Sequence, residues 1–223
     1  MSEETILDEI EFAENPEPRC PCVLLLDTSG SMSGSAIGAL NQGLQTFKHA
    51  LAEDGLASRR FEIAIITFDS KVTVVQDFVT ADQYEPVSMA AGGATAMGTA
   101  IVTGLDMVRD RKKQYRENGI SYYRPWIFMI TDGEPQGEAS DIVDEAAARI
   151  RTEEETRSVA FFAVGVEGAN MEKLRAIAVR DPVKLNGLNF GEMFVWLSAS
   201  MQRVSHSKFD DQVDLPPLGW GTV

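Results

Sequence analysis

The chain has 223 residues and a formal charge of −14, because 20 Lys and Arg residues stand against 34 Asp and Glu residues. This acidic balance excludes a typical nucleic-acid-binding protein, whose affinity depends on clustered positive charge. Hydrophobic residues make up 44% of the chain, yet no apolar run approaches the roughly 20 residues that span a bilayer. We therefore expect one globular domain with no nucleic-acid partner and no membrane span.

The N-terminal segment carries seven acidic residues before Arg19. It has neither the basic start nor the apolar centre of a secretory signal, so we expect a cytoplasmic protein. The sequence divides into an acidic lead-in (1–18), a folded domain (19–207) and a C-terminal tail (208–223). An exposed Trp220 would make the tail a candidate contact for another protein.

Cys20 and Cys22 lie at the start of the first apolar run. Two cysteines are too few for a disulfide framework or a structural zinc site. Their position predicts buried thiols, with a redox pair as the alternative.

Continuous apolar runs predict strands that are buried on both faces, which is typical of parallel sheets. These runs cover residues 23–26, 63–68, 126–130 and 159–166. Residues 71–78 follow the second run after a very short turn and predict an antiparallel strand at the sheet edge. Residues 183–185 could add a sixth strand.

Apolar residues at helical spacing predict helices between these strands, the first starting after Gly34 and the second near Met97. The residues that mark them are Ile37, Leu40, Leu44, Phe47 and Leu51; Ile101, Leu105 and Val108; Ile142, Ala146 and Ile150; Met171, Leu174 and Ile177; and Met193, Leu197, Met201 and Val204. The alternation implies a doubly wound α/β fold with a mostly parallel central sheet, one antiparallel edge strand and helices on both faces.

Hydroxyl and carboxylate residues follow the predicted strands at one edge of this sheet. They stand in Asp27-Thr28-Ser29-Gly30-Ser31, in Gly92-Gly93-Ala94-Thr95 and in Thr131-Asp132-Gly133. Ligands of such sheets bind beyond the carboxyl ends of the strands. An all-oxygen set without imidazole or thiolate suits Mg²⁺, Mn²⁺ or Ca²⁺, and it leaves a coordination position open for an outside ligand.

These three motifs, in this order, resemble the von Willebrand factor A domain and its metal-ion-dependent adhesion site. The Asp-x-Ser-x-Ser motif of that family matches Asp27, Ser29 and Ser31, its threonine matches Thr95, and its last aspartate matches Asp132. The resemblance implies that the hydroxyls touch the metal and that one or both aspartates act through water. A Glu or Asp carboxylate from a protein partner would complete the coordination sphere.

A solitary domain with Leu-Leu-Leu-Asp-Thr-Ser-Gly-Ser-Met near its start also resembles the bacterial TerY-like proteins of tellurite resistance and chemical stress. The resemblance implies a metal-dependent docking module rather than an enzyme, with a protein kinase or a PP2C-type phosphatase as candidate partners. A regulatory subunit of an ATPase or chelatase-like machine is the alternative. Gln136-Gly137 departs from the Thr-Asp that the family often has there.

Enzymatic alternatives lack key residues. The loop from Gly30 to Gly34 has neither the spacing nor the lysine of a Walker loop, and both His49 and His206 fall in predicted helices, away from the strand ends. A haloacid-dehalogenase-like phosphatase would need a second aspartate where Ser29 stands.

Six of the twenty basic residues lie between Arg109 and Arg124. Such a run is typical of a solvated helix end, which the helix dipole favours. A contact patch for an acidic partner is the alternative, with Lys112 and Lys113 at its centre.

Overall fold

A computed structural model describes residues 12–208 and 213–222. Its strands form one sheet in the order β3-β2-β1-β4-β5-β6-β7. The strands are β1 (Cys20–Asp27), β2 (Phe61–Phe68), β3 (Val72–Thr80), β4 (Trp126–Thr131), β5 (Ala160–Gly165), β6 (Val183–Leu185) and β7 (Gly221–Thr222). The helices are η1 (Gly30–Met32), α2 (Ser35–Leu51), α3 (Gly55–Arg60), α4 (Met97–Glu117), α5 (Ser140–Glu155), α6 (Met171–Ile177) and α7 (Phe190–Ser205).

The predicted fold class is confirmed. β2, β1, β4, β5 and β6 run parallel, and β3 pairs antiparallel with β2 at one edge, as predicted. The short β7 adds an antiparallel pairing at the other edge, which the sequence did not predict, and α3 was not predicted either. No helix in the described ranges is long and apolar enough to cross a membrane.

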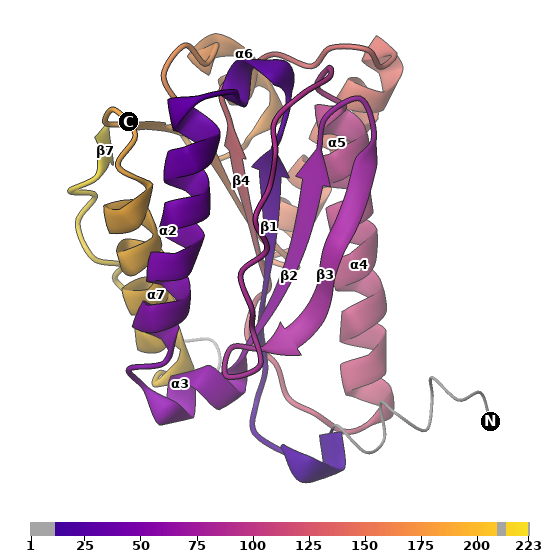
Figure 1. Ribbon diagram of the computed structural model, residues 1–223. Coiled ribbons are helices and arrows are strands. Elements are labelled where there is room, and N and C mark those ends of the chain that lie inside the picture. The colour runs from indigo at the N-terminus through magenta and orange to yellow at the C-terminus, as the bar shows by residue number, and fades with distance from the viewer. Residues whose placement is uncertain (1–11, 209–212, 223) are drawn as a thin grey trace.

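Helices cover both faces of the sheet, with α2 and α7 on one side and α4 and α5 on the other (Figure 1). Side chains of β1 alternate between the two apolar layers that result. Cys22 and Leu24 pack in the layer that contains α2 and α7 residues, whereas Val23 and Leu25 pack in the layer that contains α4 and α5 residues. Every residue of β1 is buried, as an unbroken apolar run predicts.

The prediction of buried thiols is confirmed, because Cys20 and Cys22 are both free and buried. Burial raises the pKa of Cys22 to about 12. Burial also raises the pKa of Cys20, and the neighbouring Cys22 and Glu62 raise it further.

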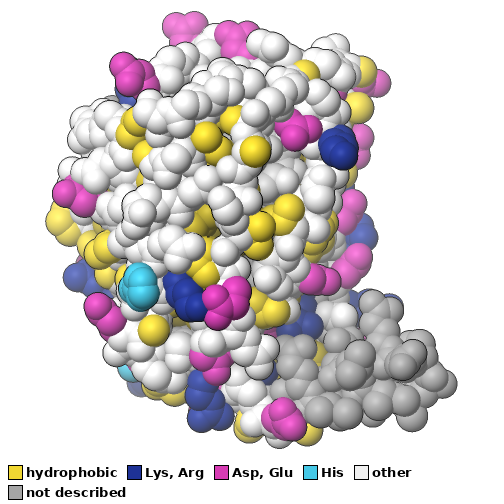
Figure 2. Space-filling model, viewed as in Figure 1, with side chains coloured by type: hydrophobic (Ala, Val, Ile, Leu, Met, Phe, Trp, Pro, Cys, Tyr) yellow, Lys and Arg dark blue, Asp and Glu magenta, His cyan; other side chains and the backbone are white. Residues whose placement is uncertain are grey.

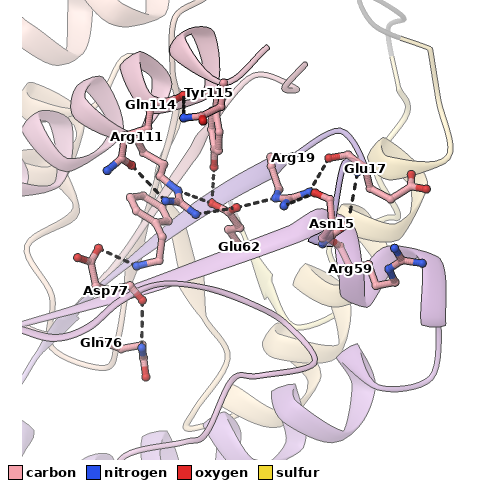
Figure 3. A network of polar contacts seen from close by, with 12 residues as sticks. Asn15, Glu17, Arg19, Arg59, Glu62, Gln76, Asp77, Arg111, Gln114 and Tyr115 are labelled. Carbon is pink, nitrogen blue, oxygen red and sulfur yellow. Dashed lines mark hydrogen bonds and ion pairs between the residues drawn. The ribbon is translucent and has the colours of Figure 1, made fainter. Parts of the chain in front are cut away.

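A charged cluster is buried at the amino end of β2 (Figure 3). Glu62 is fully buried; it accepts hydrogen bonds from Arg19 Nε at 2.7 Å and from Arg111 Nε at 2.8 Å. The Tyr115 hydroxyl donates to the same carboxylate. The Arg111 guanidinium lies 4.8 Å from the centroid of the Phe12 ring. The cluster therefore fastens the chain before β1 onto β2 and α4.

The solvated-end interpretation of residues 109–124 is therefore wrong for Arg111, of which only 6% is exposed. Arg109 pairs with acidic residues on its own helix, and Lys113 lies 3.7 Å from Glu117. Arg124 pairs with Glu154 at 2.6 Å. Most of the positive charge in this run is thus matched by nearby carboxylates, which weakens its interpretation as an acidic-partner patch.

The described part of the C-terminal tail, residues 213–222, packs against the domain. Trp220 is 2% exposed and its ring packs against Trp196 with centroids 5.5 Å apart. Trp196 Nε1 also donates to the Pro216 carbonyl at 2.8 Å. Because Trp220 is buried, the condition for a tail contact through an exposed tryptophan is not met.

Candidate metal centre

Asp27 lies at the end of β1, beside the end of β4, because the two strands are parallel neighbours. Its carboxylate is fully buried. Oδ2 accepts a hydrogen bond from Thr131 Oγ1 at 2.5 Å, and Oδ1 accepts one from the Ser29 backbone N–H at 2.8 Å. Sequence reasoning missed Thr131; the available signal was a hydroxyl residue directly before Asp132.

Hydroxyl groups connect the first loop to Asp132. Ser29 Oγ and Ser31 Oγ are 3.0 Å apart, and Ser31 Oγ donates to Asp132 Oδ1 at 2.7 Å. Ser31 and Asp132 are 101 residues apart in the chain. The first and third motifs of the sequence therefore meet at this edge.

Gly133, in the third loop, lies close to side-chain oxygens of the first and second loops. A Cβ atom built on Gly133 would lie 3.7 Å from Thr95 Oγ1, 3.9 Å from Asp27 Oδ2 and 3.9 Å from Ser31 Oγ. These oxygens hence surround one small region of space. The structure thus brings together all the predicted site residues, with Ser29 and Asp132 joined to the cluster through Ser31.

The second loop is held against the first by backbone contacts. The Gly30 N–H donates to the Gly93 carbonyl at 3.1 Å. Gly93 has φ +82°, and a Cβ there would lie only 2.5 Å from Ser70 Oγ, so glycine alone fits this position. Ser70 Oγ also accepts from the Ala94 N–H at 2.9 Å, a role that sequence reasoning missed.

The third loop is also fastened to the second. Thr95 and Gln136 exchange backbone hydrogen bonds in both directions, at 3.1 and 2.9 Å. The Glu138 carboxylate accepts from the Gly98 N–H at 2.7 Å and from Thr99 Oγ1 at 3.0 Å. Gln136, where the sequence departs from the family pattern, thus holds Thr95 in place through its backbone, while Thr99 is engaged by Glu138 at the start of α4.

Burial raises the pKa of the Asp27 carboxyl, and the negative charge of Asp132 raises it further. Hydrogen bonds from Ser29 and Thr131 act in the opposite direction because they favour the charged form. A cation would stabilise a buried carboxylate that faces a second carboxylate. In the described parts of the chain, no group of three or more His, Cys, Asp and Glu residues could hold a metal. The candidate cluster differs from such a group because only two of its members are carboxylates and the others are hydroxyls.

The donor set fits a hard divalent cation. Its members are carboxylate and hydroxyl oxygens, which Mg²⁺, Mn²⁺ and Ca²⁺ prefer to nitrogen and sulfur. Two carboxylates, from Asp27 and Asp132, would balance the charge of one such ion. The hydroxyls of Ser29, Ser31 and Thr95 are uncharged, so the occupied site would carry no net negative charge. An ion held here could therefore still bind an external anion.

Comparison with protein families matches residues 22–190 to the von Willebrand factor type A domain. The chain belongs to this family. Domains of this family are protein-interaction modules. A comparison with curated protein sequences found no match.

Solved structures share the fold at low sequence identity. A von Willebrand factor type A protein from Catenulispora acidiphila has a TM-score of 0.66 at 18% identity, covering 83% of this chain and 43% of that one. The pilus adhesin SpaC from Lactobacillus rhamnosus GG has a TM-score of 0.66 at 14% identity, covering 84% and 30%. The PilB minor pilin from Streptococcus sanguinis has a TM-score of 0.57 at 12% identity, covering 83% and 62%. This chain thus spans less than two thirds of each of these proteins.

Proposed function

We propose that this protein binds a protein partner through a divalent cation held by Asp27, Ser29, Ser31, Thr95 and Asp132. The observation that carries the proposal is the convergence of oxygens from the first and second loops around Gly133 of the third loop, where Asp132 also accepts a hydrogen bond from Ser31. The family model that matches residues 22–190 supports it, because domains of this family act in protein interaction.

Each residue has a distinct part in this proposal. The hydroxyls of Ser29, Ser31 and Thr95 touch the ion, whereas Asp27 and Asp132 balance its charge, one or both through water. A Glu or Asp carboxylate of the partner fills the remaining position. Mg²⁺ is our first choice of ion, with Mn²⁺ or Ca²⁺ as alternatives.

We propose binding rather than catalysis. A magnesium-dependent phosphatase of the haloacid dehalogenase type would need an aspartate at the position of Ser29, and His206 is paired with Asp54 at 2.7 Å rather than with the serine loop. Hydrolysis of a generic phosphoester that requires both Mg²⁺ and Asp27 would contradict this view.

The biological setting that we propose is a bacterial stress-response or tellurite-resistance system, in the cytoplasm, based on the resemblance to TerY-like proteins. The partner would then be a protein kinase or a PP2C-type phosphatase of the same system. The alternative is a regulatory subunit of an ATPase or chelatase-like machine. Co-purification from the native cell separates the two, because each predicts a different class of bound protein.

Thr95 and Thr99 provide a matched pair for testing the metal site. Both are threonines near the start of α4, but Thr95 Oγ1 belongs to the oxygen cluster and Thr99 Oγ1 binds Glu138. Mg²⁺ at 100 times its Kd should stabilise the protein by about 2.7 kcal/mol in thermal unfolding. Thr95→Ala should weaken Mg²⁺ binding at least tenfold, whereas Thr99→Ala should leave it within twofold. Equal effects of the two substitutions would contradict the assignment.

Partner binding has a separate test. Pull-down from the native cell should recover a partner that is lost on chelation and lost in a Ser29→Ala/Ser31→Ala variant. A set of bound proteins unchanged by both treatments would refute metal-dependent docking, even if the ion itself binds.

A further inference from the structure

A second site is suggested by a cavity of about 390 Å³ at the amino ends of β4 and β5. Its volume lies within the roughly 300–1,000 Å³ of small-ligand pockets. Trp126 and Ala160, the paired first residues of these strands, line it. The candidate metal centre lies at the carboxyl ends of β1 and β4, about 17 Å away along β4. The two sites are therefore separate.

Positive charge gathers at this cavity. Arg124, Arg157, Arg180 and Lys208 all line it. Acidic side chains are spread over the face seen in Figure 2, and the whole chain carries −14. A cavity lined by four basic residues is thus a local exception in an acidic protein.

One carboxylate serves two of these arginines. Glu154 pairs with Arg124 at 2.6 Å and with Arg180 at 2.7 Å, and it also accepts from the Phe161 backbone N–H at 2.7 Å. Its oxygens are hence already occupied. Burial lowers the pKa of Arg124, Glu154 opposes this change, and the positive charge of Arg180 lowers the pKa further. The arginines are close enough to repel one another and are only partly neutralised.

Arg157 supplies the unmatched charge. It is exposed, and among residues 12–208 and 213–222 its guanidinium has no ion-pair or hydrogen-bond partner. Its backbone has φ +55°, which is uncommon for a residue that is not glycine. The turn between α5 and β5 thus places the planar guanidinium of Arg157 at the cavity, where its N–H groups could donate to phosphate oxygens.

Aromatic side chains form the other part of the lining. Tyr122, Tyr123, Trp126 and Phe162 all contribute. Trp126 and Phe162 pack with ring centroids 5.0 Å apart, and the Arg180 guanidinium lies 5.1 Å from the centroid of Phe162. Such a lining favours a ligand with a flat apolar group beside its charge.

We propose that this cavity binds a phosphomonoester carried on an aromatic group, with Arg124, Arg157 and Arg180 contacting the phosphate and the aromatic lining contacting the ring. Phosphate is favoured over a single carboxylate because it offers three acceptor oxygens to several guanidinium forks. The ligand could be a phosphorylated tyrosine side chain or a free nucleotide, which share this chemistry.

Phenyl phosphate is the probe for the test, titrated into the full chain by calorimetry at physiological salt and in the presence of chelator. We expect saturable binding, with phenol and inorganic phosphate each at least tenfold weaker. Arg157→Asn should weaken phenyl phosphate at least fivefold and preserve the fold, because asparagine tolerates positive φ. The control is Arg151→Asn, which should have no effect because Arg151 is an exposed arginine of α5 that does not line the cavity.

Two results would overturn the proposal: phenol binding as tightly as phenyl phosphate, or phenyl phosphate binding unchanged by Arg157→Asn. Glu154→Gln provides an independent check, because removing the competing carboxylate should strengthen binding several-fold. A tyrosine-phosphorylated peptide and a nucleoside monophosphate then distinguish the source, since the tighter binder identifies it. Chelation should not affect any of these results, so failure here is distinguishable from failure of the metal site.

Discussion

Replacing Glu62 by glutamine would remove the negative charge that lies between two buried guanidinium groups (Figure 3). Arg19 is 0% exposed and Arg111 is 6% exposed, so neither can recover its hydration without opening the structure. Breaking a buried ion pair by removing one partner costs about 3–5 kcal/mol. Total stabilities are about 5–15 kcal/mol, so we expect Glu62→Gln to remove about a fifth or more of the free energy of unfolding.

Urea unfolding followed by circular dichroism measures this loss as a lower transition midpoint. Glu117→Gln is the control, because Glu117 also pairs with a cation on α4, but at 3.7 Å and with 60% of its side chain exposed. That change should cost less than about 1 kcal/mol. A loss below about 1 kcal/mol for Glu62→Gln would refute the view that this cluster holds the segment before β1 on the domain.

Gly43→Ala should destabilise the protein by about 1–2 kcal/mol, because overpacking outweighs the gain in helix propensity. A Cβ at Gly43 would lie 2.9 Å from the Phe194 ring. The control is Gly38→Ala on the same helix, where a Cβ meets no atom within 4 Å, so this change should be neutral or stabilising in the same urea assay. Asp54 has a lowered pKa because it accepts hydrogen bonds from the Ala57 N–H and from the imidazole at the end of α7. Its contribution to stability is complete above its unfolded pKa of about 3.9 and is lost as the pH falls through the lower folded value. Asp54→Ala removes this helix cap and should therefore cost about 1 kcal/mol of stability at pH 7. The loss should be smaller at pH 3, where the carboxylate is partly protonated already; an equal loss at both pH values would contradict this account.

The strands were predictable because central parallel strands are apolar on both faces, as β1 and β4 are. β7 was not predictable in this way. It has two residues, and its pairing with β6 depends on the Trp220 side chain packing against Trp196 rather than on a local pattern. α3 was missed for a similar reason, since it spans six residues and its signal is the Asp54 cap.

Residue types at the candidate site could be read from the sequence, but their supporting contacts could not. Asp27, Ser31 and Thr95 stand at the ends of apolar runs or in glycine-containing loops, which indicates an oxygen-rich edge. Thr131 and Glu138 act on partners that are far away in the chain, at the end of β1 and the start of α4, and the pairing of such groups depends on the folded arrangement. The same holds for Arg111, which appears in sequence as part of a basic run and whose partner Glu62 is 49 residues away.

The separation of 104 residues between Asp27 and Thr131 has a consequence for folding kinetics. β1 can pair with β2 early, because the two are close in the chain, but the oxygen cluster exists only after β4 docks on the other side of β1. Closing so long a loop is an entropically costly step. An ion that needs oxygens from the ends of both β1 and β4 has no complete binding site before that step. Binding of the ion would therefore indicate that β4 has already paired with β1.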